Sequence, residues 1–190
     1  MAHIAIDARI INSSTGRYVE LLITQQQEVA LINTYSILVP EKDANYWKPY
    51  SPNFTVRTVN YKNYSVNEQV GFANYLTKLN PDLVHFCMPQ QPIAYKGKKV
   101  TTFHDLTLLK TYNSDKNWLM YHTKQLIGSF VFKRAAADNN HIITVSNFTK
   151  KELQELTPVD DNKITTIYES SDVETVKPKK YKLPFKKYIM

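Results

Sequence analysis

Short apolar runs alternate along this sequence with longer segments whose apolar residues recur at helical spacing, and this alternation limits the fold more than any other feature. The first apolar run covers residues 3–7, and the first helical segment covers residues 15–30. Strands that are separated by helices join through right-handed crossovers, which gives a parallel sheet with helices on both faces. We therefore expect an α/β fold with a mainly parallel sheet.

The same pattern places the remaining elements. Further strands are expected at residues 35–39, 54–60, 83–86, 100–103, 142–145 and 163–168. Further helices are expected at residues 65–79, 115–139 and 146–156. Ser65 is a residue type that favours an N-cap, Glu68 three positions later completes a capping box, and Pro81 ends that helix.

The last part of the chain differs from the rest in composition. After Pro178 it is rich in lysine, and residues 186–190 resemble the start of another buried strand. A strand is not stable without partners, so these residues are either the first strand of a second domain or a frayed tail. We expect one domain over residues 1–176, followed over residues 177–190 by a basic linker and the first strand of an absent C-terminal domain.

Glycine and cysteine counts exclude several kinds of site. The four glycines are Gly16, Gly71, Gly97 and Gly128, and their spacing fits neither G-x-G-x-x-G nor a P-loop. The single cysteine, Cys87, cannot form an internal disulfide or a Cys-rich zinc cluster, which agrees with a reducing compartment. Two common nucleotide-binding loops are therefore excluded.

The 190-residue chain carries a formal net charge of +7, which would suit nucleic acid or an anionic membrane as a partner. Much of this excess belongs to six lysines near the C-terminus: Lys177, Lys179, Lys180, Lys182, Lys186 and Lys187. No window approaches the run of about 20 apolar residues that a spanning helix needs, and residues 1–4 do not begin a signal peptide. We expect a cytoplasmic protein that could touch the inner face of the membrane peripherally.

In a parallel sheet, ligands collect at the carboxyl ends of the strands, so the residues that follow each strand are the candidates for a site. After the first strand, a loop of small residues leads to Gly16 and Arg17 at the start of a helix. Free backbone N–H groups and the positive end of the helix dipole would suit a phosphate or a sugar hydroxyl there. The alternative is a plain helix cap by Ser14 or Thr15 with an exposed Arg17.

An imidazole and a carboxylate follow the strand at residues 100–103. His104 could donate to a substrate hydroxyl or orient it, because a neutral imidazole has one donor and one acceptor. Asp105 could bind substrate or cap the next short helix. A purely structural role for His104 is the alternative.

Two further strand ends carry polar residues. Gln90 and Gln91 follow the strand at residues 83–86, and their amides could bond a sugar or another polyol. Ser146 and Lys150 lie at a helix start after the strand at residues 142–145, where Ser146 could also be a simple cap. We expect His85 to pack within its strand.

The order of these motifs carries a resemblance. The motifs are residues 6–9 (IDAR), 15–18 (TGRY), 82–85 (DLVH), 103–106 (FHDL), 145–150 (VSNFTK) and 164–168 (ITTIY). In this order they resemble the N-terminal half of family 4 glycosyltransferases, which are GT-B enzymes with two Rossmann-like domains facing one another across a cleft. The resemblance runs from about residue 4 to residue 190 and implies a Rossmann-like sheet.

The resemblance also implies an activity. The family transfers a sugar from a nucleotide-diphosphate sugar to an acceptor with retention of configuration and without a metal or other cofactor. It implies that His104 is the catalytic histidine near the transferred sugar. It also implies that Gly16 and Arg17 approach the donor phosphates and that Ser146 and Lys150 face the cleft. One departure is Ser14, where many members have a further glycine.

These implications define the expected partners. The nucleotide-sugar donor of this hexosyltransferase would be held mostly by the absent C-terminal domain, so the 190 residues alone should be inactive. The acceptor would be a sugar, a polysaccharide or a lipid-linked molecule, and no nucleic acid is expected. The alternative is a non-catalytic Rossmann-like binding module whose basic surface docks anionic lipid or nucleic acid. A different α/β enzyme that acts through His104 and Asp105 is a third interpretation.

Overall fold

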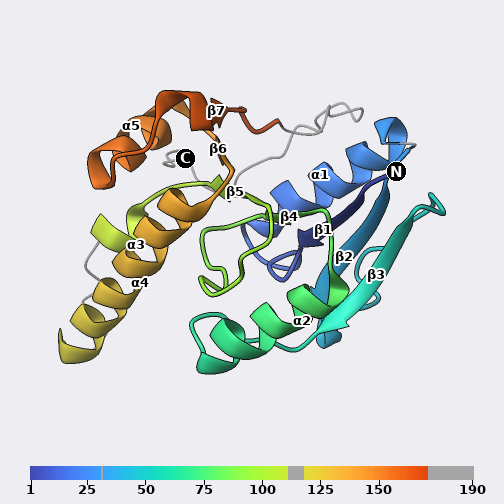
Figure 1. The fold of residues 1–190 in the computed structure, drawn as a ribbon, viewed down its shortest axis with the longest axis horizontal. Helices are drawn as coiled ribbons and strands as arrows, with labels where there is room; N and C mark the ends of the chain where they lie inside the picture. The colour runs from blue at the N-terminus through green and yellow to red at the C-terminus, as the bar shows by residue number, and fades with distance from the viewer. Residues whose placement is uncertain (31, 111–117, 171–190) are drawn as a thin grey trace, which may run out of the picture.

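The computed structural model describes residues 1–30, 32–110 and 118–170, and within them it contains a seven-stranded sheet (Figure 1). The strands are β1 (His3–Asp7), β2 (Thr34–Pro40), β3 (Phe54–Val59), β4 (Leu83–Phe86), β5 (Lys99–Phe103), β6 (His141–Thr144) and β7 (Ile164–Thr166). Their order in the sheet is β3-β2-β1-β4-β5-β6-β7. Every pair of neighbours is parallel, which confirms the expected sheet.

The helices cover both faces of this sheet. They are α1 (Gly16–Val29), α2 (Ala73–Leu79), α3 (Thr107–Lys110), α4 (Trp118–Asp138) and α5 (Asn147–Leu156). The chain moves outward from β1 to β3 and then returns to β4, so right-handed crossovers place α1 and α2 on opposite faces. Figure 1 shows α1 on one side of the sheet and α2 on the other. None of the helices in the described residues is long and apolar enough to cross a bilayer.

Alternating residues of the central strands form the two sides of the core. Ile6 and Ile37 point to the face that α1 covers, where Val19 and Ile23 of α1 pack against them. Their neighbours Ala5 and Leu38 point to the other face, toward α2. This period of two is the pattern of a strand that is buried on both faces.

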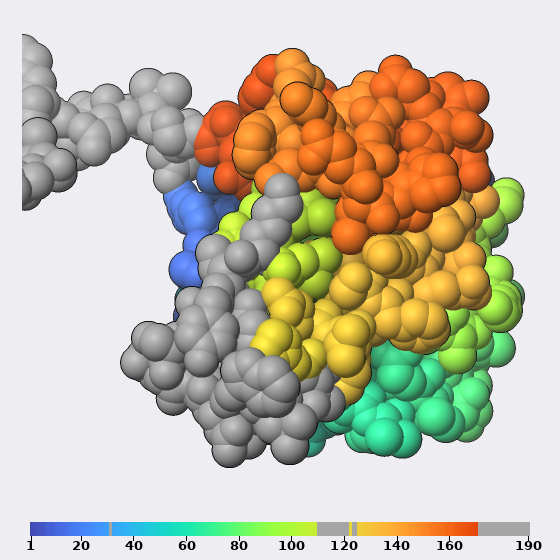
Figure 2. Space-filling view, turned by 90° about the vertical axis from the view of Figure 1, so that its left-hand side faces the viewer, coloured from blue at the N-terminus to red at the C-terminus, as the bar shows by residue number. Residues whose placement is uncertain are grey.

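A third cluster lies under α4 and α5. Phe103 of β5 and Ile142 of β6 pack against Phe132 and Ala135 of α4, and Leu153 of α5 completes the cluster. Both helices are exposed on the same face of the molecule in Figure 2. The part of the sheet formed by β5, β6 and β7 is thus covered on one face by α4 and α5.

The predicted helix at residues 65–79 differs from the structure in its first turns. A π-helical segment, Glu68–Phe72, precedes α2. The Ser65 hydroxyl accepts from the Glu68 N–H at 3.0 Å, as a cap should. The Glu68 carboxylate accepts from Tyr64 N–H and pairs with Arg9, so this side chain does not complete the expected capping box.

Several sequence predictions concern residues that the structure does not describe. Of the helix expected at residues 115–139, residues 115–117 lie outside the described residues. The described helix, α4, begins at Trp118. The basic linker and the strand expected at residues 186–190 lie wholly outside the described residues. The last described strand, β7, ends at Thr166, two residues earlier than expected.

Candidate functional site

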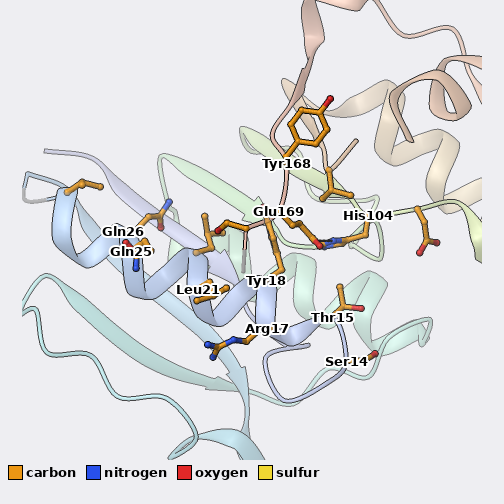
Figure 3. Close-up of a pocket in the computed structure, with 15 residues that line it drawn as sticks. Ser14, Thr15, Arg17, Tyr18, Leu21, Gln25, Gln26, His104, Tyr168 and Glu169 are labelled. Atoms are coloured by element: carbon orange, nitrogen blue, oxygen red, sulfur yellow. Dashed lines mark hydrogen bonds and ion pairs between the residues drawn. The ribbon is translucent and has the colours of Figure 1, made fainter. Parts of the chain in front are cut away.

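A groove of about 660 Å³ lies at the carboxyl ends of β5, β6 and β7, beside α1 (Figure 3). The loop before α1 and α1 itself contribute Ser14, Thr15, Arg17, Tyr18, Leu21 and Gln25 to its lining. The residues that follow the three strands contribute His104, Asp105, Val145, Tyr168, Glu169 and Ser170. The groove therefore occupies the place where a doubly wound sheet binds its ligands.

His104 is held by both nitrogens of its ring. Its Nε2 lies 2.9 Å from the backbone oxygen of Cys87, and its Nδ1 lies 2.8 Å from Oε1 of Glu169. A carbonyl oxygen only accepts, so Nε2 donates to it. The Glu169 side chain is about half exposed, whereas the His104 side chain is 15% exposed. The nitrogen of His104 on the groove side is therefore Nδ1, and Glu169 already contacts it.

Tyr18 supports the His104 ring from α1. The two rings are nearly perpendicular, with 4.8 Å between their centroids. The Tyr18 hydroxyl is 3.0 Å from Oγ1 of Thr102, which is 2.9 Å from Nε2 of His85. Burial raises the pKa of Tyr18 and lowers the pKa of His85 to about 4, so both side chains are neutral near pH 7. As expected from the sequence, His85 packs within its strand.

Gly16 begins α1 where the chain passes very close to itself. A Cβ at this position would overlap the backbone oxygens of Ile10 and Ile11, so only glycine fits. The close approach is therefore to the protein's own loop. The next residue, Arg17, is half exposed, lines the groove and pairs with Glu20 at 2.9 Å.

The start of α5 contacts the backbone of His104. The Ser146 hydroxyl accepts from Thr149 N–H at 3.0 Å, which makes Ser146 the N-cap of α5. The Thr149 hydroxyl donates to the backbone oxygen of His104 at 2.9 Å. Lys150 does not line the groove, because its ammonium group pairs with Asp161 at 2.7 Å.

Asp105 both lines the groove and caps the next helix. Its Oδ1 accepts from Thr107 N–H at 2.8 Å at the start of α3. Gln90 and Gln91 lie elsewhere and are buried. The Oε1 of Gln91 accepts from the Thr101 hydroxyl at 2.9 Å, and neither glutamine lines the groove.

The structure thus gathers part of the predicted site. Arg17, His104 and Asp105 share the groove, and Gly16 and Ser146 are sequence neighbours of its lining residues at the starts of α1 and α5. Gln90, Gln91 and Lys150 lie outside it.

Sequence reasoning missed Tyr168 and Glu169, which line the groove next to His104. The rule that ligands collect at strand ends could have found them, because they lie two and three residues after the end of β7.

A buried charged cluster lies beyond the end of β1. The Arg9 guanidinium pairs with Asp7 and with Glu68, each at 2.8 Å, and its carbon lies 4.3 Å from the centroid of the Phe72 ring. Burial raises the pKa of Glu68, although Arg9 opposes this effect. The cluster ties β1 to the π-helical segment.

Residue types that bind metals do not converge in the described part of the chain, where no group of three or more His, Cys, Asp or Glu side chains could hold an ion. Cys87 is buried, and burial raises the pKa of its thiol well above the usual value. A thiol in this state is a poor nucleophile.

Comparison with known proteins identifies a family. The sequence profile described as Glycosyltransferase Family 4 matches residues 19–175. No curated protein matches the chain. Among solved structures, the chain is similar to one described as lipopolysaccharide outer core galactosyltransferase WaaB apo form, with 11% identity and a TM-score of 0.47. That alignment covers 92% of this chain and 47% of the other, so this chain spans about half its length. Because the family profile covers most of its residues, the chain belongs to glycosyltransferase family 4.

Proposed function

We propose that residues 1–176 form the acceptor-side domain of a retaining GT-B glycosyltransferase, which transfers a hexosyl group from a nucleotide-diphosphate sugar. The observation that carries this proposal is the position of His104, fixed at the end of β5 with Nδ1 beside the groove. Family membership supports glycosyl transfer in general. In this proposal, His104 is the catalytic residue and contacts the transferred sugar.

The lining of the groove suits a sugar. His104, Asp105 and Glu169 supply hydrogen-bonding groups for hydroxyls, and two tyrosines, Tyr18 and Tyr168, supply aromatic surface. Sugars bind to such mixtures because they combine hydroxyls with apolar C–H faces. We assign Arg17 and Asp105 to substrate binding on this basis. Gly16 and Ser146 do not line the groove, and we propose that they take part in substrate binding through the helix starts that they form. Lys150, Gln90 and Gln91 would join only after a rearrangement of their present contacts.

The leaving nucleotide diphosphate carries negative charge, which must be stabilised as the glycosidic bond breaks. Arg17 lies in the first turn of α1, where the helix dipole is positive, and it lines the groove. It can therefore neutralise part of this charge. We propose that no metal takes part and that a second domain, reached through the linker at residues 177–190, holds most of the donor.

The same proposal defines the acceptor and the location. The acceptor is a sugar, a polysaccharide or a lipid-linked molecule in the cytoplasm. The lysines of residues 177–190 would favour an anionic membrane surface if the acceptor is lipid-linked. Without the second domain, we expect the 190 residues to be inactive.

The test compares the 190-residue chain with the polypeptide that continues into the proposed second domain. Each is incubated with UDP-galactose, UDP-glucose or GDP-mannose, and release of the nucleotide diphosphate is measured. We expect release only by the longer polypeptide, and His104→Ala should lower kcat by about 100-fold. His141→Ala is the matched control, because His141 bonds Thr165 on β7 outside the groove.

Two results would contradict the proposed catalytic role of His104 or the proposed retention of configuration. One is undiminished release by the His104→Ala protein. The other is a product whose anomeric configuration, read by proton NMR, is inverted relative to the donor. Tight binding of a nucleotide sugar to the 190 residues alone would contradict the assignment of the donor to the second domain.

A further inference from the structure

The two nitrogens of His104 differ in what holds them. Nε2 donates to the backbone oxygen of Cys87, a fully buried residue that directly follows β4. Nδ1 contacts the carboxylate of Glu169, which lines the groove. The first partner belongs to the core and stays in place, whereas the second is a half-exposed side chain.

Glu169 lies on a segment that has left the sheet. The last sheet-like bond before it is the one from Ile167 N–H to Thr144 O, at 2.9 Å. Glu169 lies two residues beyond this bond, and Figure 3 shows its side chain reaching across to the His104 ring. Moving this carboxylate therefore breaks no strand pairing.

An imidazole has only two nitrogens, so a ligand can hydrogen-bond to His104 only where one of them is released. Because Nε2 is held by the core, Nδ1 is the nitrogen that a ligand in the groove can reach. The Glu169 carboxylate occupies that position. Ligand and Glu169 therefore compete for the same atom.

We propose that Glu169 takes the place of a sugar hydroxyl on Nδ1 of His104 and that sugar binding displaces it. This inference rests on the proposed function, in which His104 contacts the transferred sugar. The exchange replaces the Glu169 carboxylate by a sugar hydroxyl as the partner of Nδ1, while Nε2 keeps its bond to the Cys87 oxygen. The displaced carboxylate stays at the groove and accepts a hydrogen bond from a second hydroxyl of the same sugar.

The contact between Glu169 and Nδ1 can be measured without any ligand. Diethyl pyrocarbonate modifies an unprotonated imidazole nitrogen, so the rate of His104 modification, read by peptide mass spectrometry, reports whether Nδ1 is covered. We expect Glu169→Ala to raise this rate about tenfold, because a charge-assisted hydrogen bond is lost. Glu169→Gln should raise it less, because the amide can still donate to Nδ1. The matched control is Glu155→Ala, which removes an exposed carboxylate of α5 outside the groove.

His141 in the same samples is the internal reference, since its rate should not differ among the proteins. An equal His104 rate in the original chain and in both Glu169 variants would overturn the inference. So would an equal increase in the Glu155→Ala protein.

A second arm uses the polypeptide that continues into the proposed second domain, with and without Glu169→Ala, adds UDP-galactose, UDP-glucose or GDP-mannose, and measures protection of His104. We expect protection in the Glu169→Ala polypeptide at a nucleotide-sugar concentration about tenfold lower than in the unsubstituted polypeptide. Protection at the same concentration in both would overturn the displacement step. A raised rate in Glu169→Ala without protection in any protein would support the Glu169 contact and count against sugar binding at His104, which is the proposed function.

Discussion

The phenol ring of Tyr18 stands at 85° to the imidazole of His104, with 4.8 Å between the ring centroids. This contact joins α1 to the end of β5, and the Tyr18 hydroxyl extends it to Thr102 at 3.0 Å. Thr149 at the start of α5 adds a bond to the backbone oxygen of His104. The histidine is thus fixed by elements that are far apart in the sequence, which is the arrangement a positioned side chain requires.

Tyr18 allows the ring contact to be separated from the hydroxyl bond. Tyr18→Phe keeps the ring and loses the bond to Thr102, which should lower the free energy of unfolding by about 1 kcal/mol. Tyr18→Ala also leaves a cavity beside His104, which should cost about 3 kcal/mol. Urea unfolding measures both. Equal losses in the two variants would show that the hydroxyl, not the ring, carries the stabilisation.

Gly16→Ala should be strongly destabilising, because the added Cβ overlaps the backbone oxygens of Ile10 and Ile11. Backbone cannot move aside as a side chain end can, so we expect a loss of about 3 kcal/mol in the free energy of unfolding. The midpoint of thermal unfolding, followed by circular dichroism, should fall accordingly.

Gly128→Ala is the matched control, because Gly128 lies inside α4. A Cβ there would lie 3.3 Å from the end of the flexible Leu108 side chain, so a small shift makes room. Alanine also favours a helix, and the net change should stay within about 1 kcal/mol. A larger loss at Gly128 than at Gly16 would contradict the explanation.

The strands were predictable because each is short, apolar and separated from the next by a helix or a loop. The register of Ile6 and Leu38 toward opposite faces follows from the same period of two. The π-helical segment Glu68–Phe72 was not predicted, and neither was the pairing of its Glu68 with the distant Arg9. Pairings across the fold leave no periodic signal in the sequence.

The candidate site was predictable to a similar extent. His104 could be predicted at the groove because it directly follows a strand, and residues that follow parallel strands lie at the carboxyl edge of the sheet. The direction of Lys150 depends on Asp161, and that of Gln91 on Thr101. Neither partner can be inferred from spacing, so these side chains were expected at a groove that they do not line.

His85 should make the chain less stable in mild acid. Burial lowers its pKa to about 4, from an ordinary value of 6.5 in the unfolded chain. The unfolded state therefore binds a proton at a higher pH than the folded state does. The free energy of unfolding should be highest above pH 6.5, fall as the pH drops toward 4 and then level off, with a total contribution of about 3 kcal/mol.

His85→Gln provides the comparison, because glutamine can bond Thr102 and does not titrate. Urea unfolding of both proteins at pH 7, 5.5 and 4 should show the original chain losing about 3 kcal/mol relative to the variant. Other titrating groups are common to both proteins and cancel in the difference. A difference that stays constant with pH would mean that His85 does not titrate between the two states in this range.

Arg9→Met should cost more stability than Glu68→Gln, although both break the same ion pair. The Arg9 side chain is 5% exposed and pairs with Asp7 as well, so its loss leaves two buried carboxylates without their cation and should cost about 3 to 5 kcal/mol. Glu68→Gln leaves Arg9 paired with Asp7 and removes a carboxylate whose pKa burial already raises, so it should cost about 1 kcal/mol.

Urea unfolding at pH 7 measures the loss in each variant. Arg9→Lys keeps the charge but loses the forked geometry, so its loss should lie between the other two. Equal losses in Arg9→Met and Glu68→Gln would mean that Asp7 does not depend on Arg9 for its charge compensation.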